Sequence, residues 1–202
     1  NINLDFNYLK KNLNFVNLKL DYLGLKILSE NFSLKEENNF YLIEGDLKNS
    51  KGPIPKEIIS SVLKDEFFEN VILSSKNHFS LKLSKKYKVS DLNIKSKISL
   101  EKAIFNFKNK IIKNYIPIFK DKLLFSSHVI DIEYKDKISV KGKGDFEIDD
   151  KKDVIKYNID FKKDNFNYNL NLSLNELPIN IDLINFLKKE NIKGQLEVRG
   201  KT

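Results

Sequence analysis

The chain alternates apolar and polar residues with a period of two over long stretches. The clearest run, FNYNLNLSL at residues 166–174, places aromatic and leucine side chains on one face and asparagine or serine on the other. Successive side chains of a β-strand point to opposite faces, so this pattern predicts a strand with one buried and one solvated face. Residues 155–161 repeat the pattern, and residues 162–165 supply turn residues between the two runs. We therefore expect a β-hairpin.

Similar runs continue along most of the chain and are separated by short charged turns. They predict strands at residues 2–8, 13–22, 40–46, 79–83, 92–100, 130–134 and 138–148. Many strands should be about ten to thirteen residues long, so at about 3.3 Å per residue they would reach roughly 30 to 40 Å. The sequence thus predicts a mostly β fold, a long, twisted antiparallel meander that forms an open groove or half-barrel with one or two short helices.

Two segments have the spacing of a helix instead. After Gly52 and Pro53, apolar residues recur at three- and four-residue intervals from Ile58 to Phe67, which predicts an amphipathic helix. A second short helix is predicted from Asp182 to about residue 189, with Asp182 as its N-cap. The stretch 110–119 contains Pro117 and fits neither period cleanly, so we leave it unassigned, with strand favoured over helix.

Composition and charge then remove several kinds of chemistry. The 202 residues include no Cys, Met or Trp, which excludes disulfides, thiolate nucleophiles and cysteine-ligated metal sites. Only His78 and His128 could contribute imidazole to a metal site. The net charge is +8, but lysines alternate with Asp, Glu and Asn, and Arg199 is the sole arginine. This mixture disfavours nucleic-acid binding, and the preference for Lys, Asn and Ile is typical of AT-rich coding sequence.

Ser126, Ser127, His128 and Asp131 resemble a catalytic triad only in composition. We expect Ser126 and His128 to share one strand face, collinear rather than convergent, and no Gly-x-Ser-x-Gly elbow exposes a serine. The sequence therefore predicts no enzyme, no metal site and no cofactor.

Two further clusters have structural interpretations. Gly142 and Gly144 lie inside an alternating run with no helix after it, which favours a bend in a strand over a phosphate-binding loop. A group of acidic residues without EF-hand spacing predicts a solvated hairpin turn. Its members are Asp145, Glu147, Asp149, Asp150 and Asp153.

The function depends on what covers the long apolar face. Three alternatives are open: the core of a closed sandwich, the lipid-facing wall of an outer-membrane barrel, or the lining of an open groove for acyl chains. Helix-like insertions and scattered aromatic residues disfavour the barrel. The sandwich would make the chain a structural or adhesion module, and strand pairing at the sheet edges would suit an envelope assembly factor.

Three segments resemble the recurring unit of the AsmA-like superfamily of bacterial envelope proteins. LPINIDLINFLKKENIKGQLEVRGKT at the end of the chain has a Leu-Pro step, a short helix and a strand that opens with Gly194. GPIPKEIISSVLKDEFFENVILSSKNHFSLKLS has the same order of proline-led helix and strands, and YKDKISVKGKGDFEID is similar to the hairpins between such units. The resemblance covers residues 53–202, whereas residues 1–52 share only the strand pattern.

The resemblance implies a periplasmic lipid-transport protein, anchored in the inner membrane of a Gram-negative bacterium and active in outer-membrane biogenesis. The chain would be an internal segment of it, a single β-groove with possible sub-units 1–52, 53–176 and 177–202, the last beginning the next repeat. Its partners would be phospholipid acyl chains and neighbouring β-strands of the parent chain. The expected groove residues are Leu92, Ile94, Ile98, Ile130, Ile132, Val140, Phe146, Ile159, Phe161, Tyr168, Leu170 and Leu172.

Overall fold

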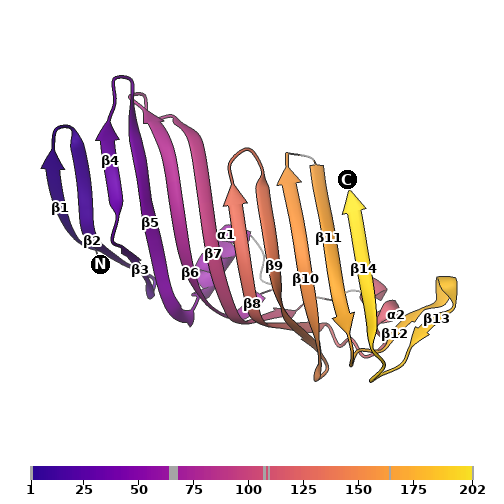
Figure 1. The fold of residues 1–202 in the computed structure, drawn as a ribbon. Helices are drawn as coiled ribbons and strands as arrows, with labels where there is room; N and C mark the ends of the chain where they lie inside the picture. The colour runs from indigo at the N-terminus through magenta and orange to yellow at the C-terminus, as the bar shows by residue number, and fades with distance from the viewer. Residues whose placement is uncertain (1, 64–67, 107, 109, 164, 202) are drawn as a thin grey trace.

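A computed structural model describes residues 2–63, 68–106, 108, 110–163 and 165–201. Its main element is one antiparallel sheet of twelve strands, in which most strands pair with their neighbours in the chain (Figure 1). The prediction of a long antiparallel meander is confirmed. The strands are β1 (Ile2–Leu9), β2 (Asn12–Tyr22), β3 (Leu25–Ser29), β4 (Phe32–Glu36), β5 (Phe40–Pro53), β6 (Phe68–Ser84), β7 (Val89–Asn106), β8 (Lys122–Tyr134), β9 (Ile138–Ile148), β10 (Lys151–Lys162), β11 (Asn165–Leu174) and β14 (Gly194–Lys201).

The sheet is open. Its order is β1-β2-β3-β5-β6-β7-β8-β9-β10-β11-β14, and β4 pairs with both β2 and β5. Strands β1 and β14 lie at opposite ends of the sheet and do not pair with each other (Figure 1). The fold is therefore an open groove rather than a closed barrel, and one continuous sheet includes strands from all three expected sub-units.

The central strands are longer than the sequence pattern suggested. Strand β6 has 17 residues and β7 has 18, whereas alternation marked only 79–83 and 92–100. Register shifts between β6 and β7 explain the difference, because each bulge moves the next residue to the other face and interrupts the alternation. Asn70 and Asp91 lie near two of these shifts with positive φ.

Helix α1 (Lys56–Leu63) confirms the first predicted helix, although Phe67 lies outside the described residues. The Pro55 carbonyl accepts hydrogen bonds from the backbone N–H groups of Ile58 and Ile59, so the proline stands at the start of the helix.

Helix α2 (Lys110–Tyr115) shows that the strand preference for 110–119 was wrong. Pro117 follows the helix instead of interrupting it, a common position just beyond a helix end.

The predicted second helix at 182–189 was also wrong. Only Asp182–Ile184 form a short 3₁₀ turn, and Asp182 is not its N-cap. Asn185 ends the turn in the left-handed conformation, with φ of 51°. The chain then returns as β13 (Phe186–Lys188), which pairs with β12 (Ile179–Ile181) in a separate two-stranded ribbon.

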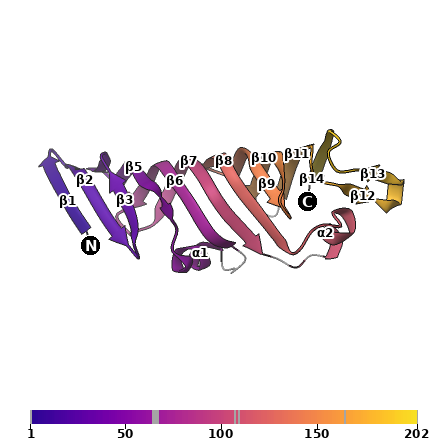
Figure 2. The ribbon, with the colours of Figure 1, turned by 90° about the horizontal axis from the view of Figure 1, so that it is seen from below.

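The hydrophobic core lies at one end of the sheet. Both helices are on the same side of the sheet (Figure 2). Helix α2 and the β12–β13 ribbon lie near the lower ends of β11 and β14 (Figure 1). Ile112 and Ile116, from α2 and the residue after it, pack against this core. The buried members are Phe119, Phe146, Ile148, Leu174, Leu177 and Ile179.

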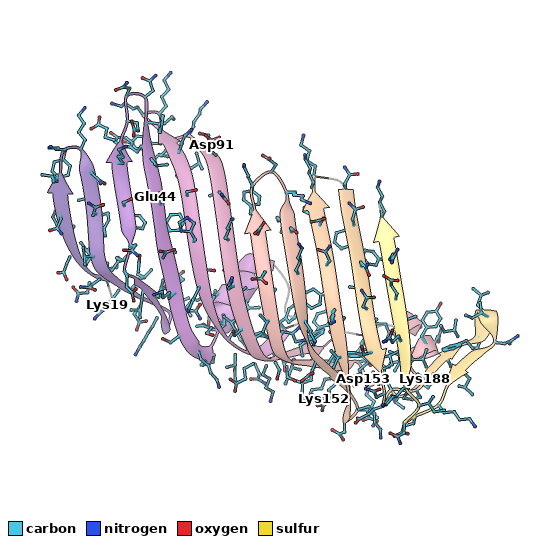
Figure 3. All side chains as sticks on the ribbon, in the orientation of Figure 1. Lys19, Glu44, Asp91, Lys152, Asp153 and Lys188 are labelled. Atoms are coloured by element: carbon cyan, nitrogen blue, oxygen red, sulfur yellow. The ribbon has the colours of Figure 1, made fainter. Side chains whose placement is uncertain are left out.

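Asp153 and Lys188 hold the loop that enters the ribbon. The Asp153 carboxylate, 2% exposed, accepts backbone N–H groups of Asn175, Glu176 and Leu177 at 2.6, 3.1 and 3.0 Å. The buried Lys188 ammonium donates to the carbonyl of Leu177 at 2.7 Å and to that of Asn175 at 3.3 Å. Figure 3 shows both residues at the lower end of the sheet. The expectation that Asp153 belongs to a solvated turn was wrong, because this carboxylate fixes a buried loop.

Candidate apolar ligand surface

Beyond the core, the apolar face of the sheet continues without a covering layer. From Ile130 to Tyr134 the apolar residues of β8 are partly buried and the polar residues between them are exposed. The α2 side chains pack on the same face, but only at its lower end. Within the described part of the chain, the upper part of this face is covered neither by the ribbon nor by a second sheet. We therefore consider this face as the candidate apolar ligand surface.

One cross-strand row on this face extends from β1 to β11, and each member pairs with the next in the strand registers. At about 4.8 Å between strands, its nine spacings reach roughly 43 Å. We call it the aromatic row. Its members are Phe6, Phe15, Phe32, Gly45, Phe79, Ile94, Tyr134, Ile138, Phe161 and Phe166.

The rings of the aromatic row make direct contacts in its first half. The Phe15 and Phe32 rings meet edge to face with centroids 5.0 Å apart, and the Phe32 and Phe79 centroids are 5.8 Å apart. Gly45 interrupts the side chains but not the surface, since a Cβ there would lie 3.1 Å from Cδ2 of Phe32. Phe32 therefore covers Gly45, and the row stays apolar from strand to strand.

Most of the expected groove residues belong to this row or to the two rows below it. The structure therefore brings nine of the twelve onto adjoining rows of one face. They are Ile94 and Phe161 in the aromatic row, Ile132, Val140, Ile159 and Tyr168 in the second row, and Ile98, Ile130 and Leu170 in the third.

The other three lie elsewhere on the same face. Leu92 precedes Ile94 by two positions in β7 and is partly buried. Phe146 is 4% exposed in the core, and Leu172 packs against the core, so both lie at the covered end.

The sequence analysis missed the first half of the aromatic row, from Phe6 to Phe79. Alternation marked Phe6, Phe15 and Phe79 as strand residues but did not mark Phe32 in β4. The register that aligns the row is set by pairing between strands, which alternation within one strand does not give.

Gly142 and Gly144 provide space for aromatic rings from neighbouring strands. Strand β9 pairs with β10 in one uninterrupted register through both glycines. A Cβ at Gly142 would overlap the Tyr157 ring, and a Cβ at Gly144 would overlap the His128 ring. Tyr168 lies over Gly200 in the same way. The glycines allow large rings to lie across neighbouring strands, a role that the sequence analysis did not predict.

His128 is the main polar side chain buried at the lower edge of this face. It is 2% exposed, with Nδ1 3.2 Å from the Tyr157 hydroxyl and Nε2 2.9 Å from the Asp145 carbonyl oxygen. Burial lowers the pKa of His128, an effect partly opposed by the Asp145 carbonyl and carboxylate. Burial also raises the pKa of Tyr157 to about 12. Both groups are therefore uncharged at neutral pH, as an apolar surface requires.

The triad residues do not share a face. A register shift between Ser126 and Val129, with Ser127 at φ of 56°, places Ser126 opposite Asp145 and Lys102 on the polar side. His128 points to the apolar side, beneath the Tyr157 ring. The expectation of a single face was wrong, and the bulge separates this serine from the imidazole.

The His128 environment predicts a pH dependence. Its pKa is lowered in the folded state, so the associated stability is present above the ordinary value of about 6.5 and is lost as pH falls below it. We expect the urea midpoint to fall between pH 7 and pH 5, and to fall less in His128→Gln. His78→Gln, at the exposed histidine beside Asp46, is the matched control. Equal acid sensitivity in all three proteins would contradict the assignment.

The opposite face is charged and mixed in sign. One row across it consists of Lys48, Lys76, Lys97, Asp131 and Lys141. Ion pairs also occur, such as Lys48 with Glu30, between β3 and β4, at 2.9 Å and Lys137, between β8 and β9, with Asp160 at 3.0 Å. This charged face is expected to be solvated, so the apolar face is the candidate ligand surface.

Comparison with known proteins finds no match to this chain among family models, curated proteins or solved structures. None of the described helices has the length and apolar character needed to span a lipid bilayer. The resemblance to the AsmA-like unit thus stays a prediction, and the functional argument depends on the geometry of the apolar face.

Proposed function

We propose that this chain is a non-enzymatic part of a bacterial envelope protein whose open apolar face holds or conducts phospholipid acyl chains between the inner and outer membranes. The observation that carries the proposal is the aromatic row, which stays apolar across ten strands and has no covering layer within the described residues. The resemblance to AsmA-like proteins supports the periplasmic setting and the inner-membrane anchor of the parent protein.

Exposure along the row supports an apolar occupant. Phe6 is 60% exposed, Phe161 45% and Phe166 36%, values far above those of core side chains. Contiguous apolar surface of this extent is rare on monomeric proteins and marks sites for apolar partners. An acyl chain needs such a continuous surface and no pattern of hydrogen-bonding groups, and the row provides that surface.

The sheet edges support partners of a second kind. All eight residues of β1 are exposed, and the outer edges of β1 and β14 have no strand partner among the described residues. Unpaired edges expose rows of backbone donors and acceptors. We propose that neighbouring strands of the parent chain pair with these edges and lengthen the apolar face.

Site-specific photo-crosslinking tests the lipid proposal. A photoreactive residue at Ile159 should form phospholipid adducts when the chain is incubated with phospholipid vesicles, because Ile159 lies on the apolar face beside Tyr168 and Val140. Asn158 is the matched control, since it is adjacent in β10 but exposed on the polar face.

Mass spectrometry of the crosslinked chain separates the outcomes. Adducts at 159 that exceed those at 158 several-fold would support the proposal. No lipid at either position would contradict it and favour a structural module. Protein crosslinks confined to probes in β1 and β14 would favour an assembly factor that acts by strand pairing.

A further inference from the structure

The apolar face contains a polar patch on its central strands, formed by Asn49, Ser75, Asn77 and Ser96. Asn49 pairs with Ser75, and Asn77 pairs with Ser96, so the patch occupies the second and third rows on β5–β7. In the same rows, Ser96 pairs with Ile132 and Ser75 pairs with Ile98. The second row therefore changes from polar to apolar between β7 and β8, and the third row changes between β6 and β7.

The patch forms its own hydrogen-bond network. Asn49 Nδ2 donates to the carbonyls of Ser50 and Leu73, at 3.3 and 3.4 Å. Asn77 Nδ2 donates to the Leu47 carbonyl at 3.2 Å and to Ser75 Oγ at 2.8 Å. The Ser75 hydroxyl donates to Asn49 Oδ1.

These bonds limit what the patch can bind. Each amide group has two N–H donors, and in both asparagines these are already engaged with protein oxygens. The network therefore offers no free amide protons to a phosphate or carboxylate group. It remains polar, and hydrocarbon lying on it would separate amide and hydroxyl groups from water without any new hydrogen bond.

The aromatic row passes beside the patch without interruption. Phe79 pairs with Gly45 on one side and Ile94 on the other, and its ring contacts Phe32. Phe79 lies two positions from Asn77 on the same face of β6, so it stands directly above the patch. Of the first three rows, the aromatic row alone joins the two halves of the face through apolar residues.

We infer that the polar patch confines acyl chains to the aromatic row where they cross β5–β7, so that Phe79 and Ile94 form the apolar passage between the two halves of the face. This inference rests on the proposed function. It assigns the patch a selective role, as a boundary that hydrocarbon does not cross.

The test is a labelling map of the 202-residue chain. A phosphatidylcholine with a diazirine in its acyl chain is photolysed with the protein in mixed vesicles, and adducts are located by peptide mass spectrometry. Because hydrocarbon on the patch would exclude water from polar groups and offer no hydrogen bond in exchange, labelling of Phe79 and Ile94 should exceed labelling of Asn49, Ser75 and Asn77 by about tenfold.

A double variant examines the cause. Asn77→Leu with Ser75→Val removes the hydrogen bonds that Ser75 and Asn77 make and turns both positions apolar, and labelling should then spread to residues 75 and 77 and to Leu47 beside them. Lys76→Leu is the matched control, because it adds an equal apolar side chain to β6 on the opposite face. This control should leave the labelling map unchanged.

The outcomes distinguish the two hypotheses. Wild-type labelling that is even over the patch and the aromatic row would overturn the boundary while leaving the lipid proposal intact. No labelling anywhere on the apolar face would overturn both. The wild-type map alone decides the point if the double variant does not fold.

Discussion

Replacing Asp153 with alanine is expected to lower the free energy of unfolding by about 3 kcal/mol, because it leaves one buried and two partly buried backbone N–H groups without their acceptor. In the variant, Lys188 still donates to the carbonyls of Asn175 and Leu177, but the N–H groups of the same loop have lost their acceptor. Urea denaturation followed by circular dichroism would measure the change in stability.

Hydrogen exchange provides a local readout of the same change. The amide of Leu177, now bonded to Asp153 at 3.0 Å, should exchange much faster in the variant. Asp131→Ala is the control, since Asp131 is exposed on β8, and its effect should stay within about 0.5 kcal/mol. An unchanged urea midpoint for Asp153→Ala, with Leu177 still protected, would show that the carboxylate does not hold the loop.

The second large effect is expected for Gly144→Ala, with a loss of about 1–3 kcal/mol. The added Cβ would overlap the His128 ring and lie 2.7 Å from the His128 Cα. A ring can rotate away, but a backbone atom on the paired strand moves only if the two strands separate. Thermal or urea unfolding of the variant would measure the cost.

Two other glycines make this prediction specific. At Gly52 the nearest atom to an added Cβ is the Ser50 carbonyl oxygen at 3.9 Å, so Gly52→Ala should be close to neutral. At Gly200 the three atoms nearest to an added Cβ belong to the Tyr168 ring, which can rotate, so the loss should be intermediate. If Gly144→Ala were as stable as Gly52→Ala, close packing of His128 against β9 would not be the reason for the glycine.

The sequence predicted the strands well where pairing is regular. Residues 155–174 were expected as a hairpin, and β10 and β11 pair there in one unbroken register. The side on which Ile159 and Leu170 lie followed directly, because alternation fixes which residues share a face.

The errors occurred where distant contacts decide the local structure. The bulge at Ser127 separates Ser126 from His128, and nothing in the local pattern marks it. Asp153 belongs to a run of acids that looks solvated, yet a loop more than twenty residues away supplies its partners. The aromatic row likewise depends on the registers of ten strands, which a period of two cannot give.

The single-layer construction of the upper sheet has a consequence for how the molecule loses its structure. There each strand is stabilised by the two strands beside it, as in repeat proteins, where stability is a sum of nearest-neighbour terms. Melting should therefore start at the β1 end, where every residue is exposed, and advance inward strand by strand. The end anchored by α2 and the β12–β13 ribbon should melt last, so that the protein unravels in one direction.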